Sequence, residues 1–392
     1  MDSLHRRLAL VLALLLCVIA DQGSTNAITE AYEAVLDRAL DLPAEERRYI
    51  IIRTSGSWGS WVRALATGMQ LAIALDRVLV LDSAFASVYG SQLVKPFSPW
   101  LITDAANDMA GLEDGDEGEV LVSLREAGRG DCWYVSHSLR DCAGVWRNSN
   151  GDGGGAPRLV LLSGPMDGGA LVQTDTELRS ALVSALPGIL SRPSQSNENT
   201  GVDDDPTLRI ELDSQTMTAV LPAPSKTLAA TIERVRASLR WGDAQLRVGV
   251  HIRGTRAASS SFWSCIERHV QVAQAALSVS SEATLIVVTS DAAAARSRAK
   301  SALGDVGRVV WPAKAAARNG EAETSTDAID DHEATLIDWW LLADTHLVVG
   351  AERSTFALTA AVRGGAPYAS ASMTRQANGG AARCGRLAPV HL

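Results

Sequence analysis

The sequence predicts an α/β protein of two domains, the second of which contains a Rossmann-like parallel sheet. Short apolar runs typical of strands alternate with longer segments whose apolar residues recur at helical spacing. The alternation is most regular after residue 245, where four to five strands are separated by helices. The 392 residues also suffice for two domains of ordinary size. We expect a leader over residues 1–20, an N-terminal domain over 28–240 and a C-terminal domain over 241–392.

The composition is that of a globular protein. Hydrophobic residues make up 46% of the chain and charged residues 21%, which leaves ample material for a core. The 36 basic and 45 acidic residues give a net charge of −9, and Lys and Arg form no dense block. This charge balance argues against a nucleic-acid partner.

The N-terminus has the pattern of a targeting segment. A short basic stretch precedes thirteen apolar residues, Leu8–Ala20, and small residues follow at candidate cleavage sites. Because a bilayer span needs about 20 apolar residues, a cleaved signal peptide is favoured over a signal anchor. We therefore expect a lumenal protein of the ER or Golgi, or a secreted one, with membrane contact through the N-terminus only.

The cysteines agree with that compartment. Cys17 lies in the leader, which leaves Cys132, Cys142, Cys265 and Cys384. An even number in an oxidising compartment allows two disulfides, and none of the spacings is that of a zinc site. The prediction is a local Cys132–Cys142 pair and a Cys265–Cys384 pair that holds the C-terminus; buried free thiols are the alternative.

The first domain begins with one βαβ unit. A helix over 28–47 is followed by a buried strand at 48–53, a Gly/Ser loop at 54–60, a helix at 61–75 and a strand at 77–82. The loop has neither G-x-G-x-x-G nor the Lys of a P-loop, so it matches no dinucleotide or Walker motif. Further along the domain, we expect a strand at 158–163 and helices at 174–190 and 225–239.

The second domain repeats strand and helix. Strands are expected at 246–252, 284–289, 308–311 and 346–350, and helices at 262–279, 291–303, 332–343 and 355–363. The tandem Trp339-Trp340 in the third of these helices is expected to pack in the core.

Candidate ligand groups fall at the carboxyl ends of these strands, where open α/β sheets bind ligands. His251 and Arg253 leave their strand on the face opposite Val248 and Val250. The planar guanidinium of Arg253 suits a two-pronged contact with phosphate. An ordinary strand whose Arg ends in solvent or a salt bridge is the alternative reading.

Two further groups share that predicted edge of the sheet. Asp291 follows the 284–289 strand, and the loop 350–356 follows the 346–350 strand. Within the loop, Ser354 is a suitable N-cap for the next helix, whose first amides can bind an anion.

These residues resemble a known family. V-G-V-H-I-R (248–253), T-S-D (289–291) and the segment 336–361 resemble the donor-binding half of GT-B fucosyltransferases, the α1,6-, α1,2- and protein O-fucosyltransferase superfamily. Segment 57–82 is similar to the N-terminal Gly-Asn-Arg loop and helix of that family. The resemblance implies a GT-B-like fold, with two Rossmann-like domains facing a cleft and a C-terminal domain that binds the nucleotide-sugar.

The resemblance also implies roles for individual residues. Arg253 would be catalytic, since it would hold the β-phosphate of GDP and stabilise the charge of the leaving group. The substrate-binding residues would be His251 and Asp291 on the donor side, Ser354, Thr355 and Phe356 at the pyrophosphate and base, and Gly59 and Arg63 on the acceptor-side loop.

The implied activity is an inverting transfer of fucose from GDP-fucose to a glycan or protein acceptor, with no metal and no cofactor. The chain departs from the family pattern at Gly254, Arg256 and Trp61, where a basic residue, an acid and an Arg are common. The alternative is a catalytically silent lumenal protein of the same fold that binds a nucleotide-sugar or a glycan.

Overall fold

The computed structural model divides the chain into two compact units, Met1–Ala223 and Pro224–Leu392. The sequence-based boundary lay at 240/241, so helix α11 (Lys226–Ser238) falls in the second unit rather than the first. The structure describes residues 27–43, 46–53, 58–81, 93–94, 100–101, 159–163, 176–186, 216–217, 219–220, 223–252, 260–290, 293–312, 331–351, 354–371, 373–374, 383–384 and 387–388.

The N-terminal unit contains a four-stranded sheet of order β4-β2-β1-β5. Its described pairs are all parallel, and the strands are Trp100–Leu101 (β4), Val78–Leu81 (β2), Tyr49–Arg53 (β1) and Leu159–Ser163 (β5). Ile50–Ile52 and all of β2 are buried. Such continuous apolar runs are typical of parallel strands that are covered on both faces.

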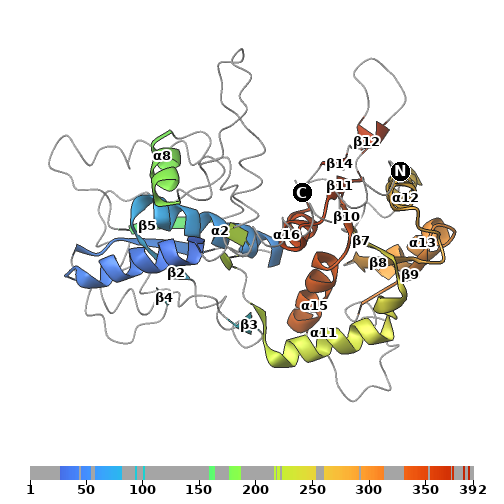
Figure 1. The fold of residues 1–392 in the computed structure, drawn as a ribbon, viewed down its shortest axis with the longest axis horizontal. Helices are drawn as coiled ribbons and strands as arrows, with labels where there is room; N and C mark the ends of the chain where they lie inside the picture. Colours follow the sequence, from blue (N-terminus) through green and yellow to red (C-terminus); the bar gives the residue numbers. More distant parts are fainter. Residues whose placement is uncertain are drawn as a thin grey trace, which may run out of the picture. The chain divides into compact units, whose positions relative to one another are not determined.

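Helices pack onto this sheet (Figure 1). Helix α2 (Trp58–Leu75) lies so close to β1 that a Cβ on Gly68 would come within 2.6 Å of the Ile52 side chain. A helix over residues 27–41 contributes Tyr32, whose hydroxyl oxygen accepts a 3.0 Å hydrogen bond from the Leu79 amide. Helix α8 (Thr176–Ala185) packs against α2.

Two helix ends differ from the sequence-based prediction. The first helix ends at residue 41 rather than 47, because Pro43 disfavours helical backbone just before it. Likewise α8 ends at Ala185, shortly before Pro187, and not at 190. None of the described helices combines the length and the apolar character that a bilayer span requires.

The C-terminal unit is built on a six-stranded sheet of order β14-β11-β10-β7-β8-β9. The described pairs are parallel, except that β14 runs antiparallel to β11. The bounds are Leu246–Ile252 (β7), Thr284–Ser290 (β8), Arg308–Val310 (β9), Leu347–Gly350 (β10), Tyr368–Ser370 (β11) and Leu387–Ala388 (β14).

Helices cover both faces of this sheet (Figure 1). They are α12 (Ser260–Leu277), α13 (Ala293–Leu303), α15 (Asp331–Ala343) and α16 (Thr355–Gly364), while α11 packs on α15. A short 3₁₀ turn, η3, spans Trp241–Asp243. Strand β12 (Met373–Thr374) pairs antiparallel with β13 (Arg383–Cys384). The other two strands of the described residues are β3 (Leu93–Val94) and β6 (Ala223–Pro224). The prediction of a parallel sheet with alternating helices is confirmed.

Alternation along β7 separates the two faces. Val248 and Val250 belong to the core cluster that includes Ile266 of α12 and Ala299 of α13. The other face lies under α15 and α16, because a Cβ on Gly249 would come within 2.7 Å of Leu342 in α15. His251 shares that second face with Gly249, since side chains two residues apart point the same way.

The core prediction for the tandem tryptophans is confirmed for Trp339. Its side chain is fully buried, and its Nε1 donates a 3.0 Å hydrogen bond to Oγ1 of Thr359 in α16. Trp340 is half-buried, and the guanidinium of Arg363 lies 5.2 Å from its ring.

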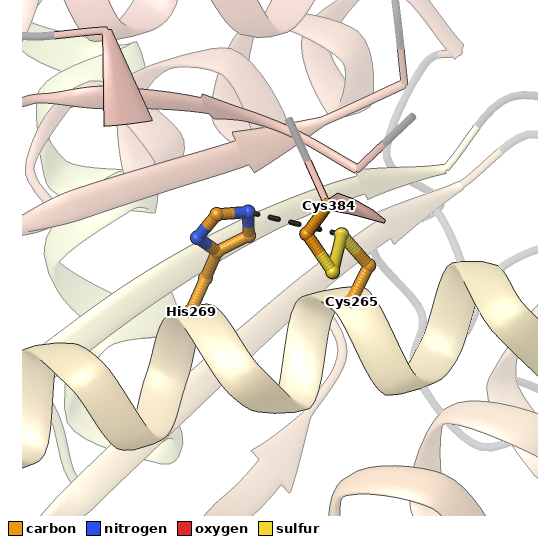
Figure 2. The surroundings of a disulfide bond; sticks show 3 residues. All are labelled: Cys265, His269 and Cys384. Carbon is orange, nitrogen blue, oxygen red and sulfur yellow. Dashed lines mark hydrogen bonds between the residues drawn. A yellow bond between two sulfur atoms is a disulfide. The ribbon is translucent and has the colours of Figure 1, made fainter. Parts of the chain in front are cut away.

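The structure joins Cys265 to Cys384 in a disulfide, the pairing predicted from the sequence (Figure 2). Their Cα atoms are 5.4 Å apart, within the range that a disulfide spans. Nε2 of His269, one turn along α12, lies 3.9 Å from Sγ of Cys265. Cys132, Cys142 and the predicted leader lie outside the described residues.

Candidate functional site

The carboxyl ends of β10, β7 and β8 meet at one edge of the C-terminal sheet. His251 on β7 is aligned with Gly350 on β10 and with Thr289 on β8. One residue further, Ile252 is aligned with Ser290. Arg253 and Asp291 follow these two residues in sequence and lie outside the described residues, so the structure does not test their predicted roles.

Among the residues that the structure describes, His251 contacts several of the elements at this edge of the sheet. It is half-buried, and its Nδ1 lies 3.0 Å from Oγ1 of Thr289. The imidazole ring also packs on Phe356 in the first turn of α16, with 4.8 Å between ring centroids and a tilt of 36°. His251 therefore connects β7, β8 and α16 at the end of the sheet where ligands bind in this class of fold.

Ser354 caps helix α16, as the sequence predicted. Its hydroxyl oxygen accepts a 3.3 Å hydrogen bond from the Ala357 amide, and its backbone is extended. The residue is 5% exposed, so its hydroxyl serves the helix end. The same helix end carries the partial positive charge of the helix dipole, which favours an anion there.

Thr355 and Phe356 form the first turn of α16. Thr355 is half-buried, and its carbonyl oxygen accepts a hydrogen bond from the Thr359 hydroxyl. Phe356 is only 9% exposed, and its ring contacts His251. Phe356 thus packs against the imidazole of His251, and the donor contact that the resemblance implies for it stays a prediction.

The start of the β10–α16 loop is held by β11. The Tyr368 hydroxyl donates a 3.0 Å hydrogen bond to the Ala351 carbonyl, and the Ala371 amide donates a 2.9 Å hydrogen bond to the Gly350 carbonyl. A Cβ on Gly350 would lie 2.7 Å from the Tyr368 hydroxyl and 2.8 Å from Cβ of Ala357. The close approach of α16 to the sheet therefore requires glycine at position 350.

Sequence reasoning missed Thr289 and Tyr368. Thr289 is the first residue of the T-S-D motif (289–291), and its place at the end of the predicted strand could have indicated that its side chain lies near the site. Tyr368 offered none, because its contact depends on β11, a strand of three residues that the apolar pattern does not reveal.

The N-terminal candidates lie in a helix. Helix α2 begins at Trp58 rather than at residue 61, so Gly59 lies in its first turn and not in the loop predicted over 54–60. Arg63 lies in the second turn, within the helix predicted over 61–75. Gly59 is buried, Arg63 is half-buried, and the Arg63 carbonyl accepts a 2.9 Å hydrogen bond from the Thr67 hydroxyl. The early start follows from Trp58, whose side chain is 2% exposed and anchors the first turn in the core.

The arrangement in the C-terminal unit can bind an anion. It combines the amino end of α16 with an imidazole at the carboxyl edge of a parallel sheet. Among the described residues, no group of three or more His, Cys, Asp or Glu side chains is placed to hold a metal ion.

The chain matches no protein-family model and no curated protein. Among solved structures, a mutant of Arabidopsis thaliana FUT1 in complex with GDP is 14% identical and has a TM-score of 0.53; the match covers 87% of this chain and 74% of that one. The NodZ α-1,6-fucosyltransferase from Bradyrhizobium, soaked with GDP-fucose, is also 14% identical, with a TM-score of 0.47 and coverage of 83% and 95%. The FUT1 match confirms the predicted GT-B-like α/β fold class.

Proposed function

We propose that the protein is a glycosyltransferase that transfers fucose from GDP-fucose to an acceptor hydroxyl. The observation that carries the proposal is the alignment of Gly350, His251 and Thr289 at one sheet edge, beside the amino end of α16. The fold likeness to FUT1, whose structure was solved with GDP, supports a guanine nucleotide as the ligand of this edge.

In the proposed reaction, the oxygen of the acceptor hydroxyl forms a bond to the anomeric carbon of fucose while the bond from that carbon to the β-phosphate oxygen breaks, and the hydroxyl proton passes to solvent. GDP leaves with both bonding electrons, so negative charge grows on the diphosphate. The amides at the start of α16 and the side chains of His251 and Arg253 would stabilise this charge. Asp291 would contact the guanine or the ribose. Displacement from the opposite side inverts the anomeric centre and needs neither a metal nor a cofactor.

On the acceptor side, we propose a glycan or a glycoprotein, with Gly59 and Arg63 near its binding surface. The basic start and short apolar stretch of the leader support action in the ER or Golgi lumen, or after secretion. An N-terminal anchor would be the protein's contact with the membrane.

A donor screen tests the proposal. The melting temperature of the full chain would be measured with GDP, GDP-fucose, GDP-mannose and UDP-sugars, and the release of GDP from GDP-fucose would be followed separately. We expect GDP to raise the melting temperature more than UDP does, because the proposed site binds a guanine nucleotide. A ligand at about 100 times its Kd stabilises the folded state by roughly 2.7 kcal/mol.

The outcomes separate the two candidate functions. GDP binding together with sugar turnover supports the transferase, whereas binding without turnover on any acceptor supports the silent binding protein. Equal or greater stabilisation by UDP would overturn the fucosyltransferase proposal. His251→Ala should reduce the shift with GDP, and replacement of exposed Arg298 on α13 by Ala provides the matched control.

A further inference from the structure

Thr289 is a buried polar residue that follows four apolar residues in strand β8. Leu285 to Val288, the four residues before it, are fully buried, and Thr289 itself is 1% exposed. A hydroxyl buried without a partner lowers stability, so a buried Thr at this position implies a specific hydrogen bond. The structure provides one in the 3.0 Å contact with Nδ1 of His251.

We propose that Thr289 is a positioning residue: its hydroxyl donates to Nδ1 of His251 and so keeps the ring proton on Nε2, ready to donate to a bound diphosphate. The inference rests on the function proposed above and adds to it a residue that touches neither donor nor acceptor. Thr289 would act only through the imidazole.

The geometry fixes the ring from two directions. Thr289 holds one nitrogen from β8, and Phe356 packs against the ring from α16. Rotation of the ring about its bond to Cβ would break the first contact and disturb the second. The backbone alignment of His251 with Thr289 sets the distance between the two side chains, so the contact is built into the sheet.

The chemistry of the ring explains why its orientation matters. A neutral imidazole has one N–H, and the partner of the other nitrogen decides which nitrogen carries it. With Nδ1 accepting from Thr289, the proton is on Nε2, which can then donate to a phosphate oxygen. With the proton on Nδ1, Nε2 would present a lone pair to the same oxygen and weaken binding.

The test uses full-length protein labelled with ¹⁵N in histidine. Long-range ¹H–¹⁵N spectra report the tautomer of His251, with the signal assigned through His251→Gln, and calorimetry reports the Kd of GDP. Thr289→Val removes the hydroxyl at similar volume, and Thr289→Ser retains it. Thr284→Val is the matched control, because Thr284 lies at the other end of β8, is equally buried and bonds Ser280 and Gln274 instead.

We expect the wild type to show the Nε2–H tautomer of His251 and Thr289→Val to show a mixture. Loss of one hydrogen bond should weaken GDP binding about fivefold in Thr289→Val, and Thr289→Ser should stay within about twofold of the wild type. Thr284→Val should lower the free energy of unfolding but leave the His251 signal and the Kd of GDP unchanged.

The readouts keep the two proposals apart. A wild-type protein that does not bind GDP overturns the proposed function, whatever the tautomer. A wild type that binds GDP but carries the proton on Nδ1 overturns the positioning role and leaves the proposed function standing. Unchanged GDP affinity in a folded Thr289→Val protein would do the same.

Discussion

Cys265 and Cys384 join the first half of helix α12 to strand β13 across 119 residues of sequence. The segment between them contains β8, β9, β10 and β11, which include most of the strand ends at the candidate site. A bond that closes so long a loop restricts the unfolded chain strongly.

Loss of this disulfide should therefore destabilise the protein. We expect Cys384→Ser to lower the free energy of unfolding by about 2–5 kcal/mol, as measured by urea denaturation under non-reducing conditions. Cys265→Ser should give the same loss, and the double variant should lose no more than either single one. Additive losses, or peptide mapping that finds both thiols free in protein from the secretory route, would contradict the pairing.

His269 makes stability dependent on pH. Burial lowers the pKa of His269 from its ordinary value of 6.5, although a backbone hydrogen bond to Ser370 opposes the shift. The folded state thus favours the neutral ring. The resulting stability is fully present above the unfolded pKa near 6.5 and is lost as the pH falls below it, through the folded pKa.

His269→Gln should consequently flatten the pH dependence. Urea denaturation at about pH 7.5 and about pH 5.5 should show a smaller loss of unfolding free energy in the variant than in the wild type. His332→Gln is the control, because His332 is exposed. Identical pH slopes for the wild type and His269→Gln would show that the neutral ring of His269 does not contribute.

Gly350 tests how closely α16 must approach the sheet. In Gly350→Ala the new methyl group would meet Tyr368 and Ala357, so either β11 or the start of α16 has to move. Overpacking of this kind costs about 1–3 kcal/mol, and we also expect weaker GDP binding because Ala357 lies in the first turn of α16.

Gly242→Ala provides the comparison, since a Cβ at Gly242 meets nothing within 4 Å. That variant should remain within about 1 kcal/mol of the wild type in urea denaturation and should bind GDP normally. If Gly350→Ala were equally harmless in both measurements, the start of α16 would be more adaptable than its packing indicates.

The sequence predicted the elements of the C-terminal unit well, because their periodicity is strong. The strict alternation of Val248, Val250 and Ile252 predicted β7 with its observed bounds, and the tandem tryptophans predicted core packing, which the fully buried Trp339 confirms. Ser354 was found as an N-cap because capping depends on a residue and its near neighbours. Such local patterns can be predicted from sequence because they do not depend on contacts with distant residues.

The misses were of another kind. Strands β11 and β14 have three and two residues, and they are strands only because of their partners across the sheet. The Thr289–His251 contact joins residues 38 positions apart and follows from strand register, which single-strand patterns do not contain. The helix predicted over 28–47 extends past Pro43, although a proline disfavours helical backbone at the residue before it, and the observed helix ends at residue 41.

Arg253 is the sharpest test of the proposed reaction. It follows β7 directly, next to the aligned pair of Ile252 and Ser290, and we expect it to contact the β-phosphate. Such a donor acts mainly on charge that grows as the sugar–oxygen bond breaks. Arg253→Ala should therefore lower kcat by roughly 10²–10³ in a GDP-fucose assay. Its urea denaturation curve should be unchanged, because a side chain at a strand end contributes little to the core.

Arg253→Lys should restore only part of the activity, because a point charge cannot reproduce the two parallel hydrogen bonds of a guanidinium. The exposed Arg298 on α13 again serves as the control, and Arg298→Ala should leave kcat unchanged. Near-normal transfer by folded Arg253→Ala would mean that the diphosphate is held by other groups. The amides of α16 and the His251–Thr289 pair would then have to supply the stabilisation assigned here to Arg253.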